Sequence, residues 1–242
     1  MKKFIVLAFS LWLSACGSAR IKDQTSVSKI KKVAIVAFTE TEPQSRKISL
    51  NVGKGVGTSA GGSMITETSP HVDSMYTSLS ENLSRQLNWK VIGLKDLKAH
   101  PAYQSAYKNT MDGWQNKMPP GQGMQDYEVE GLMDWNCLRI LKPEGRDQLI
   151  QALGVDAIIM ARSYVVLEGV TILGIGDKYP QAHVSLEIYG PGQKDPVWRE
   201  AFKGQQSEKS VGKTAFIDSE ILKEASLQSF KSAATHIGDA KE

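Results

Sequence analysis

The sequence predicts an α/β (α+β) fold in which one mixed sheet packs against helices. Two observations favour this class. In the first part of the chain, apolar strand-like runs alternate with amphipathic helical stretches, which is typical of parallel strands joined by helices. In the second part, three strand-like runs follow one another before a last amphipathic helix, which is typical of antiparallel neighbours. The expected order is β-α-β-α-α-β-β-β-α.

The elements of the first part follow from the spacing of apolar residues. The run at 32–38 is rich in Val and Ala and predicts a buried strand. Residues 73–87 predict a helix, because apolar residues recur there at every fourth position. A short strand is expected at 89–94. Pro101 is expected to open a small helix, since proline is tolerated in the first turn.

The elements of the second part are bounded by turn residues. Gly154 predicts the end of a helix, because glycine commonly follows the last turn. Alternation of apolar and polar residues at 184–189 predicts a half-buried strand, and Gly190-Pro191-Gly192 predicts the turn to its hairpin partner. The other elements expected here are a helix at 143–153, strands at 155–167 and 197–202, and a helix at 217–237.

The start of the chain carries an export signal. Lys2 and Lys3 precede the apolar run 4–13, which is too short to cross a bilayer of about 30 Å as a helix. The following Leu13-Ser14-Ala15-Cys16 resembles the bacterial lipobox, in which the signal is removed and the cysteine is acylated, for example with palmitate. We therefore expect a signal peptide at 1–15 and a lipid on Cys16. The alternative is an ordinary secretory signal and an unmodified cysteine.

The mature chain is expected to comprise a lipidated tether at 16–30 and a single domain at 31–242. Gly17 and Ser18 follow the cysteine, and in the resembled lipoprotein class a start without Asp implies the outer membrane, facing the periplasm. Lysines such as Lys29 and Lys31 lie beside the anchor, either to meet anionic head groups or simply to solvate the tether.

The charge and cysteine content exclude some classes of partner and leave others open. The precursor has 29 Lys and Arg against 26 Asp and Glu, and two of these lysines leave with the signal peptide. The mature chain is nearly neutral, so no strong field favours nucleic acid. Cys137 has no internal partner once Cys16 is acylated, which predicts either a buried thiol or a link to another chain.

A glycine-rich flap is expected at 47–65. Its apolar residues alternate with small and polar ones, as in a soluble flap or in a membrane-inserting strand of a pore, and 169–175 is a second candidate of the latter kind. The glycines lack the Gly-Lys-Ser/Thr ending of a phosphate-binding loop. The residues on the apolar side of the possible pore or flap strand are Ile48, Leu50, Val52 and Val56.

A long insertion is expected at 108–141, and it is rich in methionine and aromatic residues. Such residues on an adaptable loop suit protein recognition, although they also serve to pin a loop to its own domain. The candidate partner-binding residues are Trp114, Met118, Met124, Tyr127 and Trp135.

The sequence shows no recognisable catalytic or metal-binding set. The methionines of the insertion are spaced too widely for a compact ligand cluster, and the four histidines are scattered. A Gly-x-Ser-x-Gly motif is absent. We therefore expect a non-enzyme without metal or cofactor.

The order of the motifs resembles a group of envelope lipoprotein domains. The group includes the curli secretion channel lipoproteins, the lipoprotein activators of penicillin-binding proteins and the amino-terminal domain of the Tol propeller protein. The likeness covers roughly 31–237 and rests on Val33-Ala34-Ile35-Val36-Ala37-Phe38, on Leu79-x3-Leu83-x3-Leu87-x-Trp89-Lys90-Val91-Ile92, on Leu153-Gly154-Val155-Asp156-Ala157-Ile158-Ile159, and on Trp198 in the later hairpin.

The resemblance implies a non-catalytic protein that binds another envelope protein. It would act as an accessory, assembly or regulatory factor of an envelope complex. The alternative that it implies is an oligomeric secretion-channel subunit of curli-channel type, with membrane-inserting strands near 48–60.

Overall fold

The structure is a computed structural model that describes residues 21–45, 72–115, 126–135, 141–168, 177, 179–210 and 219–239. In chain order, its elements are β1 (Ile21–Lys22), α1 (Gln24–Ser28), β2 (Lys32–Ser45), α2 (Val72–Leu87), β3 (Lys90–Val91), α3 (Leu94–Ala99), α4 (Pro101–Gln115), β4 (Asp126–Glu128), α6 (Pro143–Leu153), β5 (Ala157–Glu168), β6 (Tyr179–Tyr189), β7 (Trp198–Gln206) and α7 (Ser219–Asp239).

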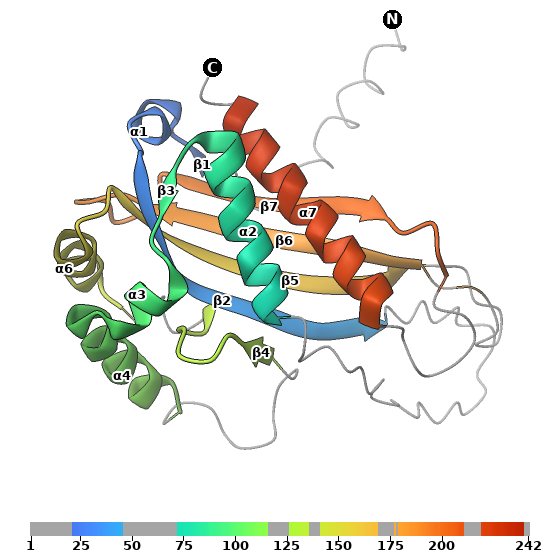
Figure 1. The fold of residues 1–242 in the computed structure, drawn as a ribbon, viewed down its shortest axis with the longest axis horizontal. Helices are drawn as coiled ribbons and strands as arrows, with labels where there is room; N and C mark the ends of the chain where they lie inside the picture. Colours follow the sequence, from blue (N-terminus) through green and yellow to red (C-terminus); the bar gives the residue numbers. More distant parts are fainter. Residues whose placement is uncertain are drawn as a thin grey trace, which may run out of the picture.

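The described strands form one mixed sheet, which confirms the predicted fold class. The sheet has seven strands in the order β1-β7-β6-β5-β2-β3, and β4 pairs with β2 beside this path (Figure 1). β2 runs parallel to β5 and to β3, whereas β5, β6, β7 and β1 pair antiparallel in turn. The early parallel pairing and the later meander are therefore as predicted.

Helices α2 and α7 cover one face of the sheet and lie side by side across it (Figure 1). Phe38 of β2 joins the two helices to the sheet. Its ring centroid lies 6.1 Å from that of Tyr76 in α2 and 5.7 Å from that of Phe230 in α7. The periodic residues of α2 are buried, and so are Phe230 and Ile237 of α7.

The outer side of β2 is closed by α4 and residues 129–135. The pairing of β2 with β5 skips a residue between Ile35 and Ala37, which marks a β-bulge at Val36. The carbonyl oxygen of Val36 accepts a hydrogen bond from the Tyr103 hydroxyl at 2.9 Å. That hydroxyl in turn accepts one from the Met133 amide at 3.0 Å. A single buried tyrosine therefore fixes α4 against the sheet.

The expected insertion at 108–141 is less separate than the sequence suggests. The helix that Pro101 opens continues to Gln115 and so enters the insertion. Buried Thr110 does not interrupt it, because the threonine hydroxyl donates to the Ala106 and Tyr107 carbonyls at 2.8 and 2.9 Å. Further along, Leu132 and Met133 are fully buried in the core. Parts of the insertion therefore belong to the domain itself.

The expected tether at 16–30 also differs from the structure in its second half. Ile21 and Lys22 pair with β7, and α1 follows at once. The Asp23 carboxylate caps α1 by accepting from the Ser26 amide at 3.0 Å. Val27 and Ile30 are buried. The folded part therefore begins earlier than the sequence indicates. The sequence could not predict this start, because two isolated apolar residues show no helical or strand period.

We predict that Gly204→Ala destabilises the domain by about 1–3 kcal/mol, as overpacking does. A Cβ at Gly204 would collide with the Ser229 hydroxyl and lie 2.8 Å from the Ala182 carbonyl oxygen, where α7 meets the sheet. Urea unfolding measures the effect. Gly190→Ala is the matched control, because its Cβ would meet Val197 at an ordinary 3.5 Å. Equal stability of both variants would contradict this account of the α7 interface.

Candidate partner-binding surface

The five residues predicted to bind a partner are only partly described. Met118 and Met124 lie outside the described residues, and only the backbones of Trp114 in α4 and Tyr127 in β4 are placed. Trp135 is 4% exposed and packs in the core, and its amide donates to the Thr39 hydroxyl at 2.8 Å. A contact role for the other four residues stays a prediction, whereas the Trp135 side chain is part of the core.

The lipidation site and the possible pore residues also lie outside the described residues. This holds for Cys16, Cys137, Ile48, Leu50, Val52 and Val56. The structure does show where the neighbouring segments begin. β2 ends at Ser45 and β5 at Glu168, and Ser45 is paired with Leu167. The glycine-rich stretch and the stretch at 169–175 therefore follow adjacent strands at the same end of the sheet.

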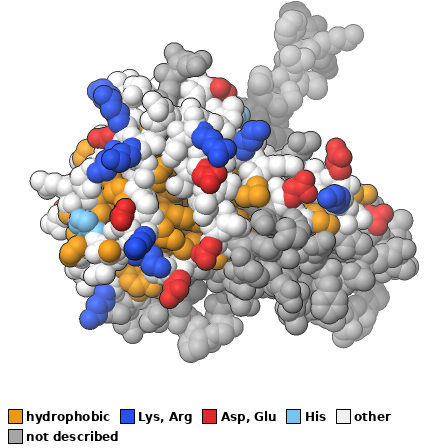
Figure 2. All heavy atoms as spheres, viewed as in Figure 1, with side chains coloured by type: hydrophobic (Ala, Val, Ile, Leu, Met, Phe, Trp, Pro, Cys, Tyr) orange, Lys and Arg blue, Asp and Glu red, His pale blue; other side chains and the backbone are white. Residues whose placement is uncertain are grey.

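An apolar surface lies over β3 and α3. We call it the β3–α3 surface and define it by Val91, Ile92 and Leu94, which pack on the core but remain partly exposed. Figure 2 shows hydrophobic side chains gathered in this region, beside α2. The surface exists because β3 is short. The Ile92 amide donates to the Val33 carbonyl at 2.9 Å, and α3 begins directly after Gly93.

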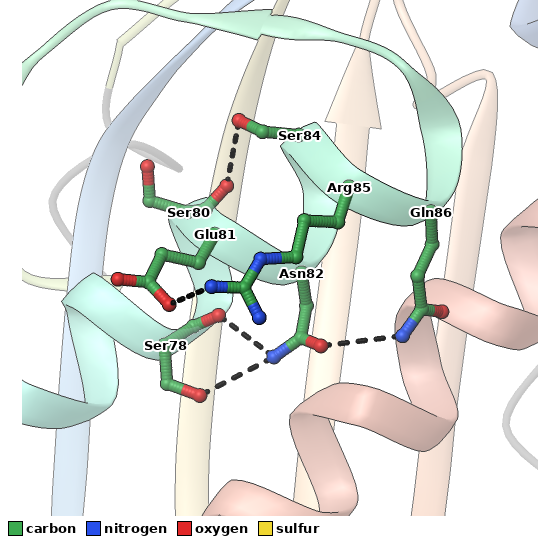
Figure 3. A network of polar contacts seen from close by, with 7 residues as sticks. All are labelled: Ser78, Ser80, Glu81, Asn82, Ser84, Arg85 and Gln86. Atoms are coloured by element: carbon green, nitrogen blue, oxygen red, sulfur yellow. Dashed lines mark hydrogen bonds and ion pairs between the residues drawn. The ribbon is translucent and has the colours of Figure 1, made fainter.

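The exposed and α7-facing sides of α2 are polar, in contrast to the β3–α3 surface. Figure 3 shows its polar side chains bonded to one another along the helix. The Asn82 amide donates to the Ser78 carbonyl at 2.8 Å, and Gln86 donates to Asn82 at 3.2 Å. Gln86 also accepts from Thr235 of α7 at 2.8 Å. Asn82 and Gln86 therefore lie on the side of α2 that faces α7, where their polar groups are paired.

A polar network on the opposite face of the sheet holds α6 in place. The Glu187 carboxylate accepts from the Tyr189 hydroxyl at 2.6 Å and from Arg199 Nε at 2.8 Å. Burial, and then the Glu187 carboxylate, raises the pKa of Tyr189 to about 12. The Arg146 guanidinium lies 4.3 Å from the centroid of the Tyr189 ring and donates to the Lys194 carbonyl at 2.7 Å. These groups link α6 to the β6–β7 hairpin.

A buried acid, Glu40, was not predicted from the sequence. It is 1% exposed and pairs across β2 and β5 with fully buried Ser163, on the face that Phe38 shares and α2 and α7 cover. Among the described residues, Glu40 Oε2, Ser163 Oγ and the Tyr76 hydroxyl find no hydrogen-bond partner. Burial raises the pKa of Glu40 to about 8, so the carboxyl is mostly neutral at pH 7. Its position two residues after Phe38 was the signal that could have revealed it.

The described residues contain no group of three or more His, Cys, Asp or Glu side chains arranged to hold a metal ion. Among the described helices, none is long and apolar enough to span a bilayer. The charged side chains that are buried among the described residues lie inside the fold; they are Glu40, Asp134, Arg146, Glu187 and Glu200. The β3–α3 surface is therefore the strongest candidate site among the described residues.

No protein-family model and no curated protein matches the chain. Solved structures similar to it include lipoprotein GNA1162 from Neisseria meningitidis (12% identity, 74% of this chain and 86% of that chain, TM-score 0.35). They also include the PelC dodecamer from Paraburkholderia phytofirmans (10%, 85% and 86%, 0.35) and the LpoB C-terminal domain from Salmonella enterica (9%, 76% and 96%, 0.31). The similar structures thus include one bacterial lipoprotein.

We predict that Glu40 makes the domain less stable as the pH rises. Its pKa is higher in the folded state than the ordinary 4.5, so the folded state holds the proton more tightly. The free energy of unfolding therefore falls between pH 4.5 and about 8, by up to about 1.4 kcal/mol per pH unit, and levels off above that.

Urea unfolding at several pH values checks this prediction. Glu40→Gln should remove the contribution of this residue to the slope, because the amide does not titrate. Glu81→Gln is the control, since Glu81 is exposed on α2 and pairs only with Arg85 at 3.3 Å. A slope that Glu40→Gln leaves unchanged would show that the carboxyl ionises freely in the folded state.

Proposed function

We propose that this protein is a lipoprotein of the outer membrane, anchored through Cys16 and facing the periplasm. It acts without catalysis, as an accessory, assembly or regulatory factor that binds another envelope protein. The observation that carries the proposal is the β3–α3 surface, an apolar patch on a domain whose first strand follows Cys16 by only five residues. The lipobox and the resembled lipoprotein group support the proposed location at the outer membrane.

The chemistry of the surface suits a protein partner. Val91, Ile92 and Leu94 offer apolar area that is already half desolvated, and exposed Lys95 and Asp96 lie at its rim. An apolar centre with a charged rim is the usual anatomy of an interface between proteins. The rim charges would set orientation, whereas the apolar centre would supply most of the binding free energy.

α4 extends the apolar area into the insertion that the sequence singled out. Tyr107 and Met111 pack on the core and stay partly exposed, and α4 contacts α3. Methionine and tyrosine adapt well to a partner surface. We therefore include the exposed parts of these two residues in the contact. Trp135 is excluded from it, because its side chain is buried.

We predict that Leu94→Glu lowers partner capture by about 10-fold or more, since burying a leucine contributes about 1.5–3 kcal/mol. Glu is acceptable at the start of α3, so folding should persist. The measurement is the yield of co-purified envelope protein after extraction of the acylated protein in mild detergent.

Ser84→Glu is the matched control, because it places the same charge on the exposed polar face of α2. Capture that survives Leu94→Glu would remove the β3–α3 surface from consideration. A deletion of 109–134 is not a suitable test, since it would take Leu132 and Met133 out of the core.

A second candidate function is an oligomeric secretion-channel subunit. The observation that favours it is the parallel pairing of β2 and β5 as far as Ser45 and Leu167. The alternating stretch near 48–60 and the second candidate at 169–175 follow these two strand ends in the sequence. In such a channel, the two stretches would each contribute membrane-inserting strands to a shared pore.

The channel reading predicts a large homomeric ring in mild detergent and conductance in planar bilayers. Leu50→Arg should abolish the conductance, because an arginine on the lipid face of a barrel strand costs about 2–4 kcal/mol at the midplane. Asn51→Arg, on the opposite parity, should be tolerated. A monomer without conductance would rule this function out and leave the accessory role.

A further inference from the structure

The position of β1 fixes where a lipid anchor can lie relative to the domain. Ile21 and Lys22 pair with Arg199 and Trp198 of β7, and the Asp23 amide donates to the Val197 carbonyl at 2.9 Å. Cys16 precedes Ile21 by five residues. Because an extended chain spans at most about 3.3–3.6 Å per residue, the acylated cysteine lies within about 17 Å of the sheet edge.

Two lysines are held rigidly at this end of the domain. Lys29 follows α1 directly, and buried Val27 and Ile30 fasten this segment to the core. Both Lys29 and Lys31 are exposed. The Asp156 carboxylate accepts hydrogen bonds from the Lys31 and Lys32 amides at 2.8 Å each, which fixes the backbone there. These cations therefore belong to the domain surface and not to a mobile tether.

The β6–β7 turn completes the same surface. A cavity of about 330 Å³ is lined by Ser26 and Lys29 from the α1 segment and by Pro191 and Gln193 from the turn. The turn is itself fixed, since the Gly192 amide donates to Asp147 at 2.8 Å. We call residues 24–31 and 191–195 the anchor-side surface. Its exposed charged side chains are Lys29, Lys31, Lys194 and Asp195, and exposed Asp156 also lines the cavity, so the lysines outnumber the acids there by one.

We propose that the anchor-side surface rests on anionic lipid head groups, so that the domain has one fixed orientation on the membrane. The inference rests on the lipid anchor of the proposed function and adds the partner of this surface. The tether length brings the surface to the membrane, and the lysines lie within reach of the negative surface potential, which extends for roughly 8 Å at physiological salt.

The orientation has a consequence for the rest of the sheet. Lys32 of β2 and Ala157 of β5 lie at the anchor-side end, whereas Ser45 and Glu168 lie at the far end. A strand rises about 3.3 Å per residue, so the far end stands roughly 35–40 Å from the anchor-side surface. The stretches near 48–60 and at 169–175 therefore start on the side turned away from this membrane.

The test uses the acylated full-length protein in two kinds of vesicle, one of phosphatidylcholine alone and one with added phosphatidylglycerol. Hydrogen–deuterium exchange of 24–31 and 191–195 should slow on the anionic vesicles. Lys29→Glu combined with Lys31→Glu should lower the ratio of docked to undocked protein about 30-fold, which corresponds to about 1 kcal/mol for each of the two lysines.

The matched control combines Lys108→Glu with Lys209→Glu. Both lysines are exposed, and Lys209 lies beyond the far end of β7. This control should keep the protection of the anchor-side surface. Equal exchange on both kinds of vesicle, in protein that remains vesicle-bound, would overturn the docking proposal. Protein that lacks the acyl mass and stays in solution would instead overturn the lipid anchor.

Discussion

β2 is buried on both faces from Val33 to Phe38, and the rest of the fold follows from this constraint. A strand without a solvent face needs cover on both sides. Phe38 directs one face toward α2 and α7, and the bulge at Val36 offers the carbonyl that Tyr103 uses to hold α4. β5 completes the arrangement as the parallel neighbour that shares the same layers.

The burial of β2 also explains where polar groups are placed. Glu40 continues the face of Phe38 beneath the two helices, so its carboxyl is removed from water and holds its proton. Thr39 faces the other way, and its hydroxyl donates to Asp134 at 2.9 Å and accepts from the Trp135 amide at 2.8 Å. Glu40 lowers the stability of the domain, whereas Thr39 fastens residues 129–135 to β2. Adjacent positions of one strand therefore have opposite effects on stability.

Periodic elements were predictable from sequence, and short or context-dependent elements were not. The apolar spacing predicts α2 and α6, and the glycine at the end of α6 predicts where that helix stops. Gly154 indeed adopts φ 57° directly after α6. β1, α1 and α3 have two to six residues, too few for a period. The β3–α3 surface was not foreseen either, because exposure of Ile92 and Leu94 depends on how far β3 extends along β2, which is a tertiary property.

The direction of strands β2 and β5 bears on both proposed functions, the accessory factor and the channel subunit. The position of β1 would hold the proposed lipid anchor at the end where β2 and β5 begin, and the candidate pore stretches follow in sequence the end where these strands finish. A tether of five residues is shorter than the sheet is long, so the anchor cannot reach past the far end. A pore strand would have to return along the whole domain before it met the lipid. An accessory factor needs no such return, because its β3–α3 surface projects from the side of a domain held at the membrane.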